Sequence, residues 1–217
     1  MKKVVLIGAT GFVGSHILQE LVSRNYEVIA IVRDLDKIAV KSSLVKAVSV
    51  DVNDSKALSE VMKGNDIVIS AFNAGWTNPD LYNDFMKGAR SIEKAAEQAF
   101  VKRLIVIGGA GSLYVDGKQI VDGDDFPEQF KAGATAARDY LNEIKNNKAL
   151  DWTYFSPAIE MHAGIKTGRT GIYRVGWDAP VFDQHGGSKL SVEDLAVAIV
   201  DELENHRFSR QRFTAAY

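Results

Sequence analysis

The sequence predicts an α/β fold with a doubly wound parallel sheet, a Rossmann fold, and three observations lead to this prediction. Short apolar runs alternate with amphipathic segments from residue 4 to residue 157, which is the pattern of successive β–α–β units. The first run is unbroken, as in a strand that helices cover on both faces. A glycine turn with the spacing G-x-x-G-x-x-G joins this run to the first helix, as in turns that approach a dinucleotide.

The glycine turn lies between the strand of residues 4–7 and a helix expected over residues 12–24. Such a turn needs residues that tolerate positive φ, a bare backbone where a pyrophosphate approaches, and a small residue where helix meets strand. The free N–H groups of the helix can then hold the phosphate charge. A tight turn without a ligand is the alternative interpretation. We expect a dinucleotide that contacts Gly8, Thr10, Gly11, Phe12, Val13 and Gly14.

The rest of the alternation predicts six parallel strands in the order 3-2-1-4-5-6, with helices on both faces. The five further strands are expected over residues 26–32, 45–50, 66–72, 102–107 and 152–156, and the helices between them over residues 55–62, 80–99 and 131–147. Right-handed connections bring the carboxyl ends of these strands to one edge of the sheet. The cofactor is expected to contact residues at that edge, namely Arg33, Asp51, Val52, Ala71, Phe72, Asn73, Gly109 and Ser156.

Arg33 follows the second strand, where an acidic residue would accept hydrogen bonds from the adenosine ribose of NAD. A guanidinium instead binds a 2′-phosphate through two hydrogen bonds and attracts its charge. The sequence therefore favours NADP over NAD as the cofactor. The alternative is an exposed arginine that pairs with Asp34 or Asp36.

The alternation ends after Pro157. Residues 115–129 are rich in Asp and Gly and are expected to form a surface loop. The glycine-rich residues 164–187 are expected to form hairpins or loops over the strand ends, before a helix that begins at Ser191 and a short strand at 213–215. We expect a single domain over residues 1–217, with residues 164–217 as a small C-terminal substrate-side region.

Composition excludes several classes of function. The net charge of −2 gives no basic footprint for nucleic acid, and no run of 18 apolar residues predicts a membrane span. The absence of cysteine excludes disulfides and thiolate metal sites and fits a cytoplasmic location. No cluster of histidines and carboxylates has metal-ligand spacing. We expect a cytoplasmic protein that acts on a small molecule, with no metal, nucleic acid or membrane as a partner; an oligomer is compatible with the sequence.

The chain resembles the short-chain dehydrogenase/reductase superfamily, above all its atypical and extended members of the NAD-dependent epimerase/dehydratase-like type. It is also similar to the NmrA-like and the flavin-reductase or biliverdin-reductase-B branches. The resemblance implies a Rossmann fold, a nicotinamide cofactor and oxidoreductase chemistry. The matching segments are residues 8–14, 32–34, 51–54, 66–70, 103–109, 156–158 and 191–196.

The proton-transfer residues of this superfamily are absent from the corresponding positions of this chain. Its Tyr-x-x-x-Lys pair is absent, because Tyr140 is followed four residues later by Ile144. When the helix expected over residues 131–147 is aligned with that of the superfamily, Lys131 stands at the Tyr position and Thr135 at the Lys position. In the biliverdin-reductase-B branch a histidine follows the sixth strand, and Ala158 stands there in this chain.

Ser112 and Tyr114, just after the fifth strand, are the remaining candidates for a proton donor or carbonyl-binding group. A loop serine and a partly buried tyrosine are the alternative. His162 is a candidate for the substrate pocket, and Arg169 and Arg174 are candidates for an anionic substrate or for a charged surface.

Three functions are consistent with these residues. The first is an NADP-preferring oxidoreductase that transfers hydride to a small carbonyl, quinone or flavin-like acceptor. The second is a non-catalytic NADP(H)-binding sensor of the NmrA type. The third is a sugar-nucleotide epimerase or dehydratase, which the short C-terminal region and the missing tyrosine weaken.

Overall fold

The computed structural model of the chain describes residues 3–217. Its main sheet has the strand order β3-β2-β1-β4-β5-β8-β10-β9, and all neighbours are parallel except β10 and β9. The predicted Rossmann order is confirmed and extended at one edge. The strands are β1 (Lys3–Ile7), β2 (Glu27–Val32), β3 (Val45–Ser49), β4 (Ile67–Ser70), β5 (Arg103–Ile107), β8 (Asp151–Phe155), β9 (Arg174–Gly176) and β10 (Gln211–Ala216).

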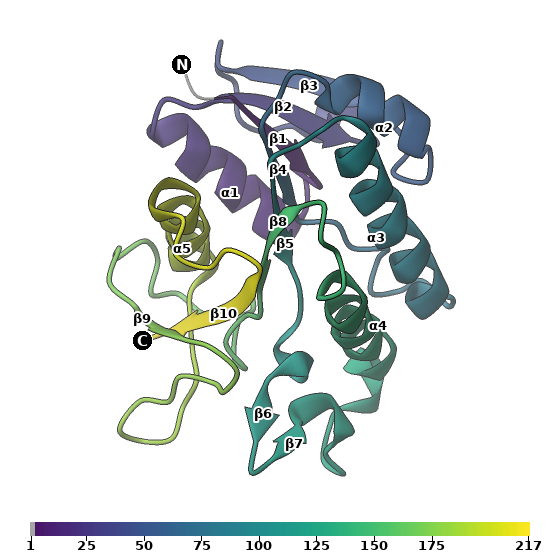
Figure 1. Cartoon of the computed structure of the whole chain (residues 1–217). Helices are drawn as coiled ribbons and strands as arrows, with labels where there is room; N and C mark the ends of the chain where they lie inside the picture. Colours follow the sequence, from purple (N-terminus) through teal and green to yellow (C-terminus); the bar gives the residue numbers. More distant parts are fainter. Residues whose placement is uncertain (1–2) are drawn as a thin grey trace.

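Helices cover both faces of this sheet (Figure 1). One face carries α1 (Phe12–Ser23) and α5 (Val192–Asn205), which pack against each other. The other face carries α2 (Ser55–Met62), α3 (Leu81–Gln98) and α4 (Glu128–Ile144). No helix in residues 3–217 is long and apolar enough to cross a membrane.

The first strand shows why its apolar run is unbroken. Val4 and Leu6 belong to the buried cluster under α1 and α5, whereas Val5 and Ile7 belong to the cluster under α2, α3 and α4. Successive side chains of a strand point to opposite faces, so a strand covered on both faces needs apolar residues at every position. β1 is therefore fixed in the centre of the sheet by its own sequence.

The last strand is longer than the sequence predicts and adds a seventh parallel strand to the expected six. β10 pairs with β8, with Gln211 opposite Thr153 and Phe213 opposite Phe155. The rings of Phe213 and Phe155 lie 4.8 Å apart, and Phe208 stacks on Phe213 at 4.6 Å. The pairing with β10 covers an edge of β8 that would otherwise remain unpaired, and the aromatic rings pack together beside it.

The prediction of a surface loop over residues 115–129 is wrong in part. The segment contains the small hairpin β6 (Tyr114–Val115) and β7 (Lys118–Gln119) and the 3₁₀ turn η3 (Ile120–Asp122), and α4 begins at Glu128. Val121 of η3 is fully buried against a second 3₁₀ turn, η2 (Ala110–Ser112). Between residues 164 and 187 the chain is mainly loop, and its strand β9 pairs antiparallel with β10.

Candidate functional site

The glycine turn forms a backbone cradle between β1, β4 and α1. Gly8 has φ +79°, and a Cβ at this position would lie 2.5 Å from the carbonyl oxygen of Ala71. A Cβ on Gly14 would lie 2.1 Å from the carbonyl oxygen of Gly8. Both distances are too short for any side chain, so only glycine permits this approach of helix to strand.

The same cradle leaves the N-terminus of α1 open. Gly11 is the N-cap residue, and no side chain caps the helix. The N–H groups of the first turn have no partner within the helix and carry its positive dipole end. A surface without side chains that presents such N–H groups fits the pyrophosphate of a dinucleotide. Thr10 and Val13 are half-buried beside it, and the ring of Phe12 is exposed.

The ends of β2 and β3 form the neighbouring part of the edge. Arg33 is exposed directly after β2, and its carbonyl oxygen accepts a hydrogen bond from Ser49 Oγ at 3.1 Å. Asp34 pairs with Lys37 at 3.5 Å, and within residues 3–217 no ion pair engages the Arg33 guanidinium. The guanidinium is therefore available to an anion, and the alternative that it pairs with Asp34 or Asp36 is not observed.

Asp51 lies just beyond β3 and is exposed. One of its carboxylate oxygens accepts hydrogen bonds from the backbone N–H and the side-chain amide of Asn53, at 2.9 and 3.1 Å. The second oxygen remains open for a donor such as an adenine amino group. Val52 is half-buried and packs on the core under α2 and α3.

A cavity of about 590 Å³ lies at the carboxyl ends of β4, β5 and β8. Its walls come from the segments that follow these strands and from one face of α4. Most of the lining is apolar, and its aromatic part is Phe72, Trp76, Phe85, Phe126 and Phe130. The predicted contacts Phe72, Asn73 and Gly109 are brought together here. A mostly apolar cleft with a few polar groups is the usual form of a small-molecule site.

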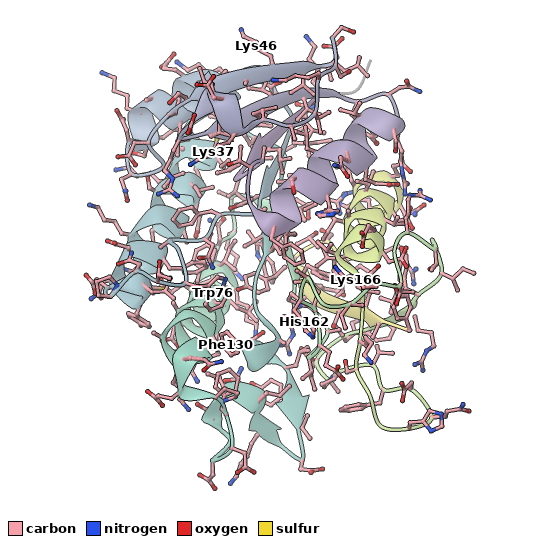
Figure 2. The ribbon with its side chains drawn as sticks, turned by 180° about the vertical axis from the view of Figure 1, so that it is seen from behind. Lys37, Lys46, Trp76, Phe130, His162 and Lys166 are labelled. Carbon is pink, nitrogen blue, oxygen red and sulfur yellow. The ribbon has the colours of Figure 1, made fainter. Side chains whose placement is uncertain are left out.

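Trp76 and Phe130 are exposed side chains of this cavity and lie together, and His162 lines the same cavity (Figure 2). Their ring centroids are 5.6 Å apart at an angle of 84°, an edge-to-face pair. Gly133 on α4 permits the pair, because a Cβ there would lie 2.7 Å from the Trp76 ring. The tryptophan is thus seated against the helix that bears the Tyr-x-x-x-Lys pair in the superfamily.

Neither predicted proton donor lines the cavity. Ser112 is fully buried, donates to the carbonyl oxygen of Gly109 at 2.9 Å and lies 2.9 Å from Ser156 Oγ. Ser156 is equally buried and lies outside the cavity lining, and its contact with a cofactor remains a prediction. Tyr114 is partly exposed under the guanidinium of Arg212, 5.6 Å from its ring, and also lies outside the cavity lining.

The basic residues of the C-terminal segment hold the fold together. Arg169 donates to the carboxylate of Glu20 at 2.8 and 2.9 Å. Arg174 donates to the carbonyl oxygens of Phe182 and Tyr217. Both guanidiniums thus have hydrogen-bond partners within the chain.

The sequence missed the contribution of residues 123–130 to the cavity. Gly123, Asp124, Asp125, Phe126, Pro127 and Phe130 all line it. Residues 123–127 precede α4 and Phe130 lies in its first turn, and this stretch has no clear periodicity, so the sequence pattern indicated only a loop. Two phenylalanines within a segment rich in Asp and Gly were the available signal, because exposed aromatic residues in such a loop mark a binding surface.

Comparison with known proteins bears on the cofactor. A family model described as NAD(P)H-binding matches residues 8–206. YwnB, an uncharacterised protein of Bacillus subtilis strain 168, is 35% identical over 215 residues, which cover 98% of this chain and 97% of YwnB.

Two solved structures are similar over the whole chain. A protein of Bacteroides thetaiotaomicron that is provisionally named an epimerase has 41% identity and a TM-score of 0.91, covering 100% of this chain and 97% of its own. A protein of Streptococcus pneumoniae TIGR4 that is provisionally named an NADH-flavin reductase has 32% identity and a TM-score of 0.87. The match covers 100% of this chain and 99% of that protein. This chain therefore belongs to the NAD(P)H-binding family of Rossmann-fold, oxidoreductase-like proteins.

Proposed function

We propose that the protein is an NADP(H)-preferring oxidoreductase that reduces a small carbonyl, quinone or flavin-like acceptor, and that flat aromatic acceptors are its preferred class. The observation that carries the proposal is the aromatic cavity at the ends of β4, β5 and β8, on the same sheet edge as the glycine turn. Planar rings stack favourably on aromatic side chains. Trp76 and Phe130 at the rim supply such faces.

In this proposal some residues bind the cofactor and others shape the cavity that receives the acceptor. The N–H groups at the start of α1 hold the pyrophosphate, and Arg33 binds the 2′-phosphate. When bound, the cofactor supplies hydride. Phe72 and Gly109 shape the floor of the cavity, while Trp76 and Phe130 exclude water from its rim.

The cavity offers no tyrosine–lysine pair for proton transfer, and this favours one kind of acceptor. A simple ketone develops localised negative charge on oxygen and needs an acid at that point. A quinone or flavin spreads the charge over its ring system, so water can supply the proton afterwards. The name of the 32% identical structure, an NADH-flavin reductase, agrees with acceptors of this type.

A second candidate is a sensor that binds NADP(H) without turnover. It is favoured by the burial of Ser112 and by the position of Tyr114 outside the cavity, which leave the expected proton donors without access to a substrate. A sensor would bind cofactor, release no product and change its affinity for a partner protein.

The proposal is tested by following NADPH oxidation with small aldehydes, ketones, quinones and riboflavin. Turnover that is fastest with the quinones or riboflavin supports it, whereas cofactor binding without turnover of any acceptor favours the sensor.

Cofactor preference is tested separately with Arg33→Gln. Loss of the charged bidentate contact should weaken NADPH binding about 10-fold and leave NADH binding within twofold. Lys63→Gln, at the C-cap of α2 and paired with Glu60, is the matched control and should change neither dissociation constant. Equal affinity of the wild type for NADPH and NADH would contradict the preference.

A further inference from the structure

His162 reaches the cavity wall from the segment that follows β8, and its ring is held by a backbone contact. The N–H of Gly164 donates to His162 Nδ1 at 3.1 Å. A Cβ on Gly164 would lie 2.8 Å from both Nδ1 and Cε1 of the ring. The Nδ1–Cε1 edge is therefore pressed against the Gly164 backbone, and the Nε2 side of the ring is left free.

This contact selects one tautomer of the neutral imidazole. A nitrogen that accepts a hydrogen bond from a backbone N–H carries no proton, so the ring proton is on Nε2. Within residues 3–217 no group is hydrogen-bonded to His162 Nε2, and the side chain lines the same cavity as Trp76 and Phe130. The cavity wall thus has an N–H donor on the exposed His162 side chain, whose ring the Gly164 N–H holds at Nδ1.

We infer that His162 is the carbonyl-binding residue of the reaction: its Nε2–H donates to the acceptor oxygen on which negative charge accumulates. The inference rests on the proposed function and assigns a residue to it. The overall reaction is NAD(P)H plus quinone plus a proton giving NAD(P)⁺ plus hydroquinone. The cofactor gives hydride, water gives the proton, and His162 keeps its Nε2 proton throughout.

The cavity lining also contains aspartate and asparagine side chains. Asp124 and Asp125 carry carboxyl groups, which do not suit the binding of an oxygen that gains negative charge. Asn73 lies on the wall after β4, and its side-chain oxygen accepts a hydrogen bond from the N–H of Gly75 at 2.7 Å. Its Nδ2 group is a second candidate donor, and the His162 variants below separate the two. A neutral imidazole with a fixed tautomer can polarise a carbonyl in a partly dry site without giving up a proton.

The test compares His162→Phe, which removes the donor and keeps the bulk, with His162→Gln, which restores an N–H. The assay is NADPH oxidation with the best quinone of the panel. We expect His162→Phe to lower kcat about 10- to 100-fold with little change in KM, since loss of one such donor acts on the transition state. His162→Gln should recover part of the rate. His185→Phe, on the exposed 183–187 loop outside the cavity, is the matched control and should retain full kcat.

A second readout needs no turnover. Long-range ¹H–¹⁵N spectra of the wild type report the protonated ring nitrogen of each histidine, and the inference requires the Nε2–H tautomer for His162. An Nδ1–H tautomer, or a His162→Phe variant as fast as the wild type, overturns the inference and leaves the proposed function intact. Absence of turnover with every acceptor overturns the proposed function instead.

Discussion

Gly8, Gly11 and Gly14 have equal weight in the sequence motif but different roles in the structure. A Cβ on Gly14 would lie 2.1 Å from the Gly8 carbonyl oxygen, whereas a Cβ on Gly11 would come no closer than 3.4 Å to that atom. Gly14 is therefore required for the packing of α1 on β1. Gly11, the exposed N-cap residue, is required only where a ligand approaches.

This difference predicts separate effects for two alanine variants. Gly14→Ala should lower the free energy of unfolding by about 2 kcal/mol or more, because backbone must move to admit the methyl group. Gly11→Ala should change stability by less than about 1 kcal/mol and weaken NADPH binding, since its methyl group faces the pyrophosphate. Urea unfolding and cofactor titration measure the two effects. Equal destabilisation by both variants would contradict the assigned roles.

The sequence predicted the glycine turn at residue level but not the cavity next to it. The glycine turn is local, so its spacing determines its geometry. Ser112 follows β5 as expected, yet η2 turns its hydroxyl toward Ser156, and Arg212 donates to its carbonyl oxygen at 2.5 Å. That arginine is 100 residues away in sequence, and a contact of this range leaves no local pattern.

At the scale of elements, α1, α5 and the loop after residue 164 are held together by one charged cluster. Arg24, the C-cap residue of α1, donates to Glu20 at 2.8 Å and to Asp201 and Glu204 of α5 at 2.7 and 2.8 Å. Arg169 of the loop donates a hydrogen bond to the carboxylate of Glu20. The hydrogen bond from Arg169 and then that from Arg24 hold the pKa of Glu20 below its ordinary value of 4.5, although burial raises it.

The lowered pKa predicts how stability depends on pH. A carboxyl whose pKa is lower in the folded state stabilises the fold above pH 4.5 and loses this contribution as the pH falls through the folded pKa. Glu20→Gln should therefore have a lower free energy of unfolding than the wild type at pH 7. This difference between variant and wild type should shrink by about 1 kcal/mol at pH 3.5. Glu60→Gln, in an exposed pair with Lys63, is the control and should show no such gap. A gap for Glu20→Gln that is independent of pH would contradict the pKa direction.

Regular elements were predicted more closely than the connections that form the cavity. α3 begins at Leu81 and ends at Gln98, within one residue of the helix expected over 80–99, because its apolar stripe is long and periodic. The segment before α4 consists of a hairpin whose two strands have two residues each, and of short 3₁₀ turns. These are too short for any periodicity, and their packing on η2 depends on tertiary contacts.

At the scale of the whole molecule, the cavity has an acidic rim. Asp124 and Asp125 line it, and none of the lining residues that the structure describes is lysine or arginine. The nearby Lys131 is on α4 but donates to the carbonyl oxygen of Val121 and lies 5.6 Å above the Phe126 ring. An acceptor with a phosphate group would meet negative charge, so neutral acceptors should be preferred.

The acidic rim predicts selectivity between two flavins with the same ring system. The wild type should use riboflavin with at least about fivefold higher kcat/KM than FMN, since each close pair of like charges costs about 1 kcal/mol in water. The double variant Asp124→Asn, Asp125→Asn should narrow this ratio to below about twofold. Asp116→Asn, in the β6–β7 turn outside the cavity, should leave the ratio unchanged. Preference of the wild type for FMN would show that the rim does not select against charge.

The central claim is that acceptor reduction occurs in the aromatic cavity, next to a separate cofactor cradle. Ile159 lines the cavity and is 46% exposed, so a larger side chain there fills the space without disturbing the core. Ile172, 77% exposed and outside the lining, offers a matched control.

The most direct measurement is NADPH oxidation with the best quinone by Ile159→Trp and Ile172→Trp. We predict that Ile159→Trp loses at least about 10-fold in kcat/KM while its dissociation constant for NADPH stays within twofold. Ile172→Trp should match the wild type in both. Full activity of Ile159→Trp would contradict the account.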